Sequence, residues 1–266
     1  MLDPFKRHIN YLRISVTDRC NLRCRYCMPE EGIDMIAHED ILSFEEIEDL
    51  VRLSVEQGVT KIRLTGGEPL VRKGIVNLVQ MIANIEGVDD LAMTTNGILL
   101  EAMATDLKDA GLQRVNISLD TMDAKKFKHI TRGGDINKVF AGISAAQAAG
   151  LNPVKINCVV RNSGDEPDAK EVAAFCKANN LSIRYIHQMN LEDGSFSKVE
   201  GGEGGKCDTC NRIRLTADGT FKPCLFNEAG YNTKTLGNNE AFNQAITNKP
   251  KSGTKNKSGR FNQIGG

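Results

Sequence analysis

The sequence predicts an α/β fold, a partial (β/α)6 parallel barrel followed by a small C-terminal unit that carries cysteines. Three observations predict it. Short segments rich in Ile, Val and Leu alternate with amphipathic stretches from about residue 10 to 190. A glycine-rich stretch then ends the alternation. Six of the eight cysteines form two tight groups, one early in the barrel region and one after the glycine-rich stretch.

Six segments have the length and composition of buried parallel strands. They are YLRISV from Tyr11, KIRLT from Lys61, LAMTT from Leu91, RVNISL from Arg114, VKINCVV from Val154 and SIRYIH from Ser182. The first helix follows Ser43, which can cap it, with Glu46 three residues on as the capping-box partner. Further helices are expected over 75–85, 99–110, 136–149 and 169–179. Six such units make three-quarters of an eight-fold barrel and leave one side open.

The chain divides into four parts on this pattern: the barrel over 1–190, a glycine-rich linker over 191–206, a small unit over 207–247 and a tail over 248–266. The small unit is expected to contain a hairpin that turns at Ala217, Asp218 and Gly219. The tail is polar and basic, which favours a solvated terminus.

The charge balance excludes several classes of protein. Lys and Arg equal Asp and Glu at 34 each, so a general nucleic-acid binder is not expected. No apolar run approaches the ~18 residues that would span a membrane, and the first residues carry no signal-peptide core. We therefore expect a cytoplasmic protein, in which clustered thiols hold metal rather than form disulfides.

Cys20, Cys24 and Cys27 follow the first strand with the spacing Cys-x-x-x-Cys-x-x-Cys. Three thiolates on one loop suit an iron–sulfur cluster that keeps one iron free for a small chelating ligand. The alternative is a structural zinc knuckle, which needs a fourth ligand; His38 is the nearest candidate.

Cys207, Cys210 and Cys224 form the second group, again with three thiolates. A zinc ribbon would need a fourth ligand, and none follows Cys224. A second four-iron cluster is favoured, which makes the C-terminal unit a small iron–sulfur domain. Cys158 or Cys176 could supply a fourth ligand to this cluster, but both are better explained as buried free cysteines.

The first cysteine loop, with Tyr26 before its last cysteine, resembles the signature of the radical S-adenosylmethionine (SAM) superfamily. The run Gly66-Gly67-Glu68-Pro69 after the second strand agrees with it. The resemblance implies that the free iron binds the amino and carboxylate groups of SAM and that this run contacts the SAM amino group. Two glycines also permit a close approach to the backbone.

A more specific resemblance covers the whole chain. YLRISVTDRCNLRCRYCMPEEG, KIRLTGGEPLVRKG, TTNGILL, GLQRVNISLDTM, CDTCNRIRLTADG and the final Gly265-Gly266 are similar to the GTP 3′,8-cyclases of molybdenum cofactor biosynthesis. This resemblance implies a lyase with two [4Fe–4S] clusters that cleaves SAM reductively. The 5′-deoxyadenosyl radical would take a hydrogen from the GTP ribose, and a bond would close to guanine C8, giving 3′,8-cyclo-7,8-dihydro-GTP.

The resemblance also implies site residues. Contacts to SAM are expected from Tyr26, Gly66, Gly67, Glu68, Ser118 and Met189. Contacts to GTP are expected from Arg13, Arg63, Thr94, Lys155, Arg184, Arg212 and Arg214, of which Arg212 and Arg214 would steer the nucleotide. Strand interiors normally exclude charge, so several cations in one barrel indicate a polyanionic ligand. The alternative is that each is buried in a salt bridge to a carboxylate such as Glu68 or Asp120.

Three features depart from the family pattern: the stretch between Met189 and Cys207 is shorter by tens of residues, the segment RNSGDEPD differs, and His187-Gln188 precedes Met189. At the other end, Phe261 and Ile264 could anchor the Gly-Gly end of the tail at the barrel mouth.

The expected partners are GTP or a related small molecule, a flavodoxin or ferredoxin reductant and a second copy in a homodimer, with no nucleic acid and no membrane. Two rival functions remain. One is a radical SAM enzyme that acts on a peptide or another nucleotide, and the other is an iron–sulfur electron carrier or zinc-bound module.

Overall fold

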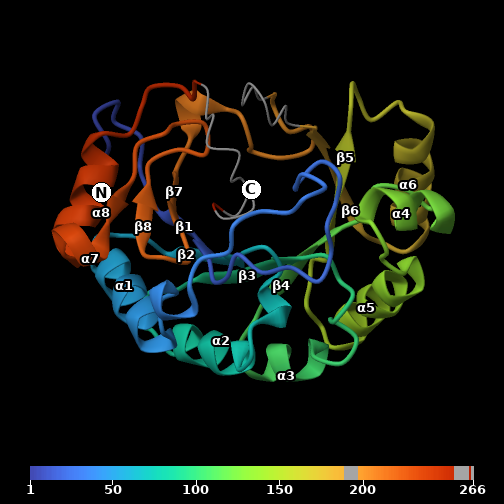
Figure 1. Cartoon of the computed structure of the whole chain (residues 1–266), viewed down its shortest axis with the longest axis horizontal. Helices are drawn as coiled ribbons and strands as arrows, with labels where there is room; N and C mark the ends of the chain where they lie inside the picture. Colours follow the sequence, from blue (N-terminus) through green and yellow to red (C-terminus); the bar gives the residue numbers. More distant parts are fainter. Residues whose placement is uncertain (189–196, 255–263, 265–266) are drawn as a thin grey trace.

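Nine strands form one curved sheet in the computed structural model, which describes residues 1–188, 197–254 and 264. Figure 1 shows the helices of the barrel along the convex outer side of this sheet. The strands are β1 Tyr11–Ser15, β2 Lys61–Thr65, β3 Asp90–Thr95, β4 Arg114–Ser118, β5 Lys155–Val160, β6 Ser182–His187, β7 Arg212–Leu215, β8 Thr220–Lys222 and β9 Tyr231–Asn232. The six strands expected in the barrel region are confirmed.

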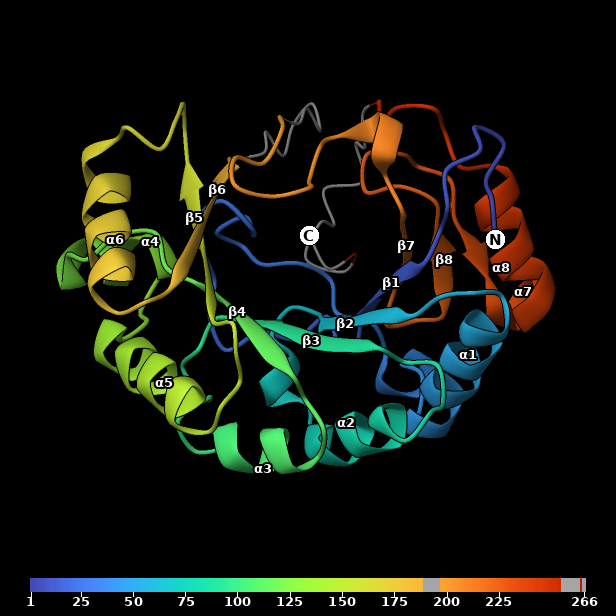
Figure 2. The same cartoon turned by 180° about the vertical axis from the view of Figure 1, so that it is seen from behind.

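The strand order is β6-β5-β4-β3-β2-β1-β7-β8-β9. All pairs from β6 to β7 are parallel, so the carboxyl ends of seven strands lie at one rim. Strand β7 pairs with β1 although some 200 residues separate them, and β8 and β9 then add antiparallel strands. Figure 2 shows the same arch from behind, with β7 and β8 beyond β1. The expected hairpin is confirmed, and Gly219 takes the left-handed conformation at its turn.

Eight helices accompany the strands in the described residues. They are α1 Phe44–Glu56, α2 Ile75–Ala83, α3 Ala104–Asp109, α4 Ala124–Thr131, α5 Ile136–Ala148, α6 Pro167–Ala178, α7 Thr233–Leu236 and α8 Asn238–Thr247. The capping box of α1 is present, with Ser43 Oγ accepting from Glu46 N and Glu46 Oε2 accepting from Ser43 N. The helix expected over 99–110 begins later, at Ala104, because turns occupy the residues before it. The sequence did not predict α4, α7 or α8.

The two faces of the sheet differ in polarity. Alternate residues such as Leu12, Ile62 and Ile117 point outward and are fully buried against the helices. The residues between them, such as Arg13, Arg63 and Asn116, face the hollow of the arch. Parallel sheets are usually apolar on both faces, so a polar inner face indicates space for a polar ligand. Cys158 and Cys176 are buried and free, as expected.

The described part of the glycine-rich segment, residues 197–206, lies between β6 and β7. Glu200 pairs with Tyr185 at the edge of β6, and Arg212 Nη2 donates to the carbonyl of Glu203, 3.1 Å away, at the start of β7. A Cβ on Gly201 would lie 3.0 Å from the carbonyl oxygen of Ile183, so glycine lets this segment lie close to the strand. None of the helices in the described ranges is long and apolar enough to cross a membrane.

Candidate functional site

The first cysteine loop leaves the carboxyl end of β1 and turns back on itself. Cys27 N and Met28 N both donate to the carbonyl of Cys24, at 2.9 and 3.0 Å, which brings Cys24 and Cys27 to one side of a tight turn. Leu22 N donates to Cys20 Sγ at 3.3 Å. All three thiols are half-buried and free, so the loop presents three sulfur donors at the rim of the barrel.

Burial raises the pKa of all three thiols. It raises the pKa of Cys24 to about 12, and the nearby Asp120 and Cys20 add to the effect. Burial and the neighbouring Cys24 also raise the pKa of Cys27. Thiolates at this position therefore need a cation close by, which the irons of a cluster would supply.

The two cysteine groups fit a multi-iron cluster better than zinc. A structural zinc site takes four protein ligands, and each group supplies three thiols. Iron–sulfur clusters are held by cysteine thiolates. The donor chemistry therefore fits an iron–sulfur cluster.

Gly66 and Gly67 pack against the backbone of this loop. Gly67 N donates to Thr17 O and Glu68 N to Arg19 O, both at 2.8 Å. A Cβ on Gly67 would lie 2.4 Å from Arg19 O, closer than any side chain tolerates. These glycines therefore allow the backbone of the cysteine loop to lie close to them, and this contact fixes the loop to the end of β2.

Glu68 is buried and joins β2 to β3. Its carboxylate accepts from Thr95 Oγ1 and Asn96 N, both at 2.7 Å, and from Leu70 N at 3.1 Å. Burial raises the pKa of Glu68 to about 7, against these hydrogen bonds. Asn96 in turn reaches the cysteine loop, where its Nδ2 donates to Asn21 Oδ1 at 2.7 Å.

Tyr26 and Asp120 connect the loop to the ends of β4 and β5. Tyr26 Oη donates to Asp120 Oδ2 at 2.7 Å, and Val159 N donates to Asp120 Oδ1 at 2.8 Å. Burial raises the pKa of Asp120 to about 6. Ser118 ends β4 nearby and is half-buried, in register with Asn157 of β5. Met189 lies outside the described residues.

The predicted cations all come from strands whose inner faces meet. Arg13 of β1 lies between Arg63 of β2 and Arg214 of β7 in the sheet register, and Arg212 is opposite Tyr11. Lys155 follows in register with Asn116 of β4, and Arg184 with Asn157 of β5. Thr94 lies between them on β3, opposite Asn116. The structure therefore brings the seven predicted GTP contacts to one concave surface.

Burial and mutual repulsion lower the pKa values of several of these cations. Burial, with the charges of Arg63 and Arg212, lowers the pKa of Arg13 to about 10. Burial, with the charges of Arg13 and Arg212, lowers the pKa of Arg214 to about 9. The pKa of Lys155 is lowered first by burial and then by Arg184. An anion among them would relieve this repulsion.

The hydrogen bonds of Glu68 and Asp120 do not support the alternative that these carboxylates form salt bridges with the strand cations. Each carboxylate accepts from a hydroxyl group and from backbone N–H instead. Asp90 does pair with a cation of the inner face: it accepts from Arg114 Nε at 3.0 Å and from Arg114 Nη2 at 2.5 Å.

Several polar atoms on the inner face are buried without a hydrogen-bond partner in the described part of the chain. They are Arg63 Nη1, Thr94 Oγ1, Arg114 Nη1, Asn116 Oδ1 and Asn157 Oδ1. Buried polar atoms are nearly always satisfied in folded proteins, so these atoms indicate a polar ligand.

Sequence reasoning missed four residues of this surface: Tyr11, Arg114, Asn116 and Asn157. Arg63 Nε donates to Tyr11 Oη, and the charges of Arg13 and Arg63 outweigh burial and lower the pKa of Tyr11. The signal that could have found the others is the alternation of Arg114, Asn116 and Ser118 with apolar residues along β4.

The second cysteine group lies at the opposite edge of the sheet, where the parallel strands begin: Cys207 and Cys210 precede β7, and Cys224 follows the antiparallel β8. Cys207 begins a short 3-10 turn, Cys207–Thr209. Burial raises the pKa of Cys210, but the charges of Lys249 and Arg212 outweigh it and lower the pKa. All three thiols are free and half-buried, and their donor chemistry fits a second cluster.

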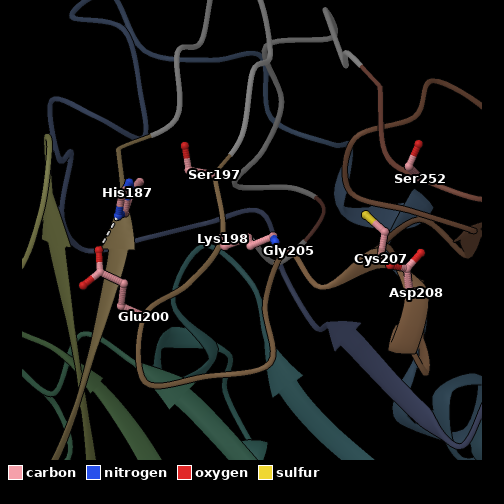
Figure 3. Close-up of a pocket in the computed structure, with 8 residues that line it drawn as sticks. All are labelled: His187, Ser197, Lys198, Glu200, Gly205, Cys207, Asp208 and Ser252. Carbon is pink, nitrogen blue, oxygen red and sulfur yellow. Dashed lines mark hydrogen bonds and ion pairs between the residues drawn. The ribbon is translucent and has the colours of Figure 1, made fainter.

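A cavity of about 680 Å³ lies beside Cys207 (Figure 3). His187 Nε2 and Glu200 Oε1 are 2.9 Å apart on one wall, and Cys207 and Asp208 are on the other. The remaining lining residues are Ser197, Lys198, Gly205 and Ser252. The short glycine-rich segment thus forms part of the wall of a hollow that opens next to the second cysteine group.

Two family models match the chain. The model for the radical SAM superfamily matches residues 14–176, and the model described as Molybdenum Cofactor Synthesis C matches residues 175–263. Together they cover both cysteine groups.

The chain is similar to proteins named GTP 3′,8-cyclase. It is 43% identical to one from Alkaliphilus metalliredigens, over 85% of this chain and 83% of the relative. It is 42% identical to one from Thermodesulfovibrio yellowstonii, over 92% of this chain and 91% of the relative. The second alignment runs over 292 positions against a chain of 266, so part of the relative has no counterpart here.

Solved structures share the fold at low sequence identity. SuiB of Streptococcus suis bound to S-adenosylmethionine has a TM-score of 0.67 at 15% identity, covering 91% of this chain and 66% of that one. The protein anSMEcpe with bound AdoMet has a TM-score of 0.65 at 16% identity, covering 90% and 78%. The comparison supports the partial barrel as the architecture of the sheet.

Proposed function

The chain belongs to the GTP 3′,8-cyclase family of the radical SAM superfamily, and from that membership we propose how its residues divide the work. It is a radical SAM enzyme that cyclises GTP in molybdenum cofactor biosynthesis, and it uses an iron–sulfur cluster and SAM. When bound, these groups supply one-electron chemistry that abstracts a hydrogen atom from the substrate.

In this proposal, Cys20, Cys24 and Cys27 hold the SAM cluster at the rim of the barrel. Gly67 and Glu68 support the loop that carries these cysteines, through their backbone hydrogen bonds to Thr17 O and Arg19 O at 2.8 Å. The proposed SAM contacts are Tyr26, Gly66, Gly67, Glu68, Ser118 and Met189. Tyr26 and Glu68 are each fixed by hydrogen bonds to residues at the ends of other strands, so both would be oriented before SAM binds.

GTP is proposed to lie against the cations of the inner face, with its triphosphate toward them. The contacts are Arg13, Arg63, Thr94, Lys155, Arg184, Arg212 and Arg214, and the steering of the nucleotide is assigned to Arg212 and Arg214. The observation that carries this assignment is the concentration of partly buried cations on one concave face, where burial and their mutual repulsion lower the pKa values of Arg13, Lys155 and Arg214. Guanidinium groups suit phosphate oxygens, which they bind through paired N–H donors.

The proposal assigns a second [4Fe–4S] cluster to Cys207, Cys210 and Cys224, with an open iron for the guanine base. Three thiol ligands instead of four support this assignment, as does the adjoining cavity. The division of the chain at 190, 206 and 247 is retained with these roles. A flavodoxin or ferredoxin reductant, a homodimer and a cytoplasmic location also belong to the proposal. A peptide substrate is disfavoured because it offers no polyanion to the inner face.

The test is anaerobic calorimetric titration of the iron-loaded protein with GTP, GDP and guanosine. Affinity should fall with each phosphate removed. Lys155→Met should weaken GTP binding by roughly tenfold, about 1.4 kcal/mol, with little effect on guanosine. Lys126→Met is the matched control, because this exposed ammonium binds Asp168 on the outer side. Equal affinity for guanosine and GTP would contradict the assignment of the cations to the triphosphate.

A further inference from the structure

The side chain of Lys249 is buried between two segments that carry cysteines. It follows α8 in the part of the chain whose composition predicted a solvated tail, yet it is only 3% exposed. Its Nζ donates to the carbonyl oxygens of Arg212 and Pro223, each 2.6 Å away, and hydrogen-bonds the thiol of Cys210. The prediction of a solvated tail is therefore wrong for this residue.

The ammonium group of Lys249 has as many donors as the site has acceptors. A protonated lysine offers three N–H donors and no acceptor, and here two carbonyls and one sulfur receive them. Arg212 is two residues after Cys210, and Pro223 directly precedes Cys224. Lys249 therefore fixes the distance between the segments that carry two of the three cysteines.

Arg7 holds the third cysteine to the same stretch of chain. Its Nη1 donates to Cys207 O and Lys251 O, both at 2.8 Å, and its Nη2 donates to Pro250 O at 2.6 Å. Asp3 orients the guanidinium through a 2.6 Å ion pair with Nε, and both side chains are buried. Residues 249–251 thus connect to all three cysteine segments.

The positive charge of Lys249 also complements the negative charge that three cluster-bound thiolates would bring. An oxidised four-iron core carries fewer positive charges than three thiolates have negative ones, so the loaded group is an anion. A buried anion without a partner is costly. The first cysteine loop has a different neighbourhood, because the buried carboxyls of Asp120 and Glu68 lie near its thiols.

We propose that Lys249 is a positioning residue and the charge partner of the second iron–sulfur cluster, and that Arg7 completes its hold on the three cysteine segments. This inference rests on the proposed assignment of Cys207, Cys210 and Cys224 to that cluster. It predicts two separable effects: retention of iron depends on both side chains, and the reduction potential depends on the charge of Lys249.

The experiment uses the full chain with Cys20, Cys24 and Cys27 replaced by alanine, so that all remaining iron belongs to the second site. Lys249→Met and Lys249→Arg are compared with Lys251→Met, whose side chain is exposed. Iron and sulfide per chain, the rate of iron loss to a chelator and the reduction potential from paramagnetic resonance titration are measured anaerobically. A merely structural role would not move the potential.

Lys249→Met should lose iron roughly tenfold faster than Lys251→Met or more, the range for residues that support metal ligands. Its potential should be lower, because the more negative reduced state loses a nearby cation, and Lys249→Arg should restore it. If Lys249→Met does not fold, Arg7→Gln should speed iron loss while leaving the potential unchanged.

Two results would overturn the inference, and they differ. A parent chain without iron would remove the second cluster itself, and the inference with it. A loaded parent in which Lys249→Met and Lys251→Met release iron equally and share one potential would overturn the role of Lys249 alone.

Discussion

Arg214 Nη1 donates a hydrogen bond to the carbonyl oxygen of Ile264, 3.2 Å away. Arg214 belongs to the inner face of the sheet, and Ile264 is buried with 3% exposure. The chain therefore returns to the cation surface within three residues of its last position. The expectation that Ile264 anchors the tail at the barrel is confirmed, whereas Phe261, Gly265 and Gly266 lie outside the described residues.

Removal of residues 264–266 should lower GTP cyclisation by roughly tenfold or more, equivalent to about 1.4 kcal/mol of transition-state stabilisation. The reason is that Arg214 loses its carbonyl partner and the barrel loses the buried Ile264. Product formation from GTP is the measurement, and iron content and SAM affinity are the controls, since both should be unchanged. Full turnover in the shortened chain would show that the tail is dispensable.

Cys24→Ala should abolish formation of 5′-deoxyadenosine from SAM, because it leaves the first loop with two sulfur donors. The iron of the second site should persist, since Cys207, Cys210 and Cys224 lie on other segments. Iron counting and product chromatography check both statements on one sample. SAM cleavage at the parent rate would contradict the assignment of the loop.

Thr94→Val should raise the free energy of unfolding of the nucleotide-free protein by about 1 kcal/mol while weakening GTP binding. The hydroxyl of Thr94 is buried without a partner in the described chain, so a methyl group of the same size removes a desolvation penalty. Thr95→Val is the matched comparison, because Thr95 Oγ1 donates to Glu68 at 2.7 Å and its loss should be destabilising. Denaturant unfolding of both variants is the measurement. Equal effects in the two variants would contradict the interpretation.

Glu68 should make the iron-free protein less stable as pH rises from about 4.5 to about 7. Burial raises the pKa of Glu68 from 4.5 to about 7, so the folded state holds this proton to higher pH than the unfolded state. The stabilisation is complete below the unfolded pKa and is lost through the folded one, on the order of 3 kcal/mol. Glu68→Gln should flatten the profile of unfolding free energy against pH. The exposed Glu86→Gln should retain the parent slope, and a parent-like slope in Glu68→Gln would exclude this carboxyl as the source.

Gly67→Ala should reduce iron loading of the first loop without affecting the second site. The added Cβ would lie 2.4 Å from the backbone oxygen of Arg19. Because the clash is with backbone, no side-chain rotation can relieve it. Gly237→Ala is the control, because a Cβ there meets no atom within 4 Å and the residue lies between α7 and α8, away from the first cysteine loop, although it too has a positive φ. Iron content after anaerobic reconstitution distinguishes them. Normal loading of Gly67→Ala would show that the loop does not depend on this approach.

The sequence predicted the barrel strands and the first helix because their signals are local. Ser43 and Glu46 lie three residues apart, and each strand shows its composition within six residues. The burial of Lys249 was not predictable in this way, since its acceptors Arg212 and Pro223 are tens of residues distant and only the fold brings them together. Helix α4 was missed because its run of lysines resembles a solvated loop more than an amphipathic helix.

In the candidate site, too, local signals were predictable from the sequence and contacts between distant segments were not. The cysteines, the glycines and the strand cations carry their chemistry in the residue type, so they could be named in advance. The roles of Asn116 and Asn157 depend on register across β4 and β5, because an asparagine becomes an unsatisfied buried acceptor only when neighbouring strands fix its side.

The pairing of β1 with β7 has a consequence for how the chain can be divided. Strand β7 supplies the parallel partner of β1 along Tyr11 to Ile14. A fragment that stops after β6 would leave β1 paired with β2 alone, so the N–H and C=O groups on its other edge would be unpaired, which is a template for association with other chains. The barrel and the segment after it therefore share one sheet, and a fragment cut between them should aggregate.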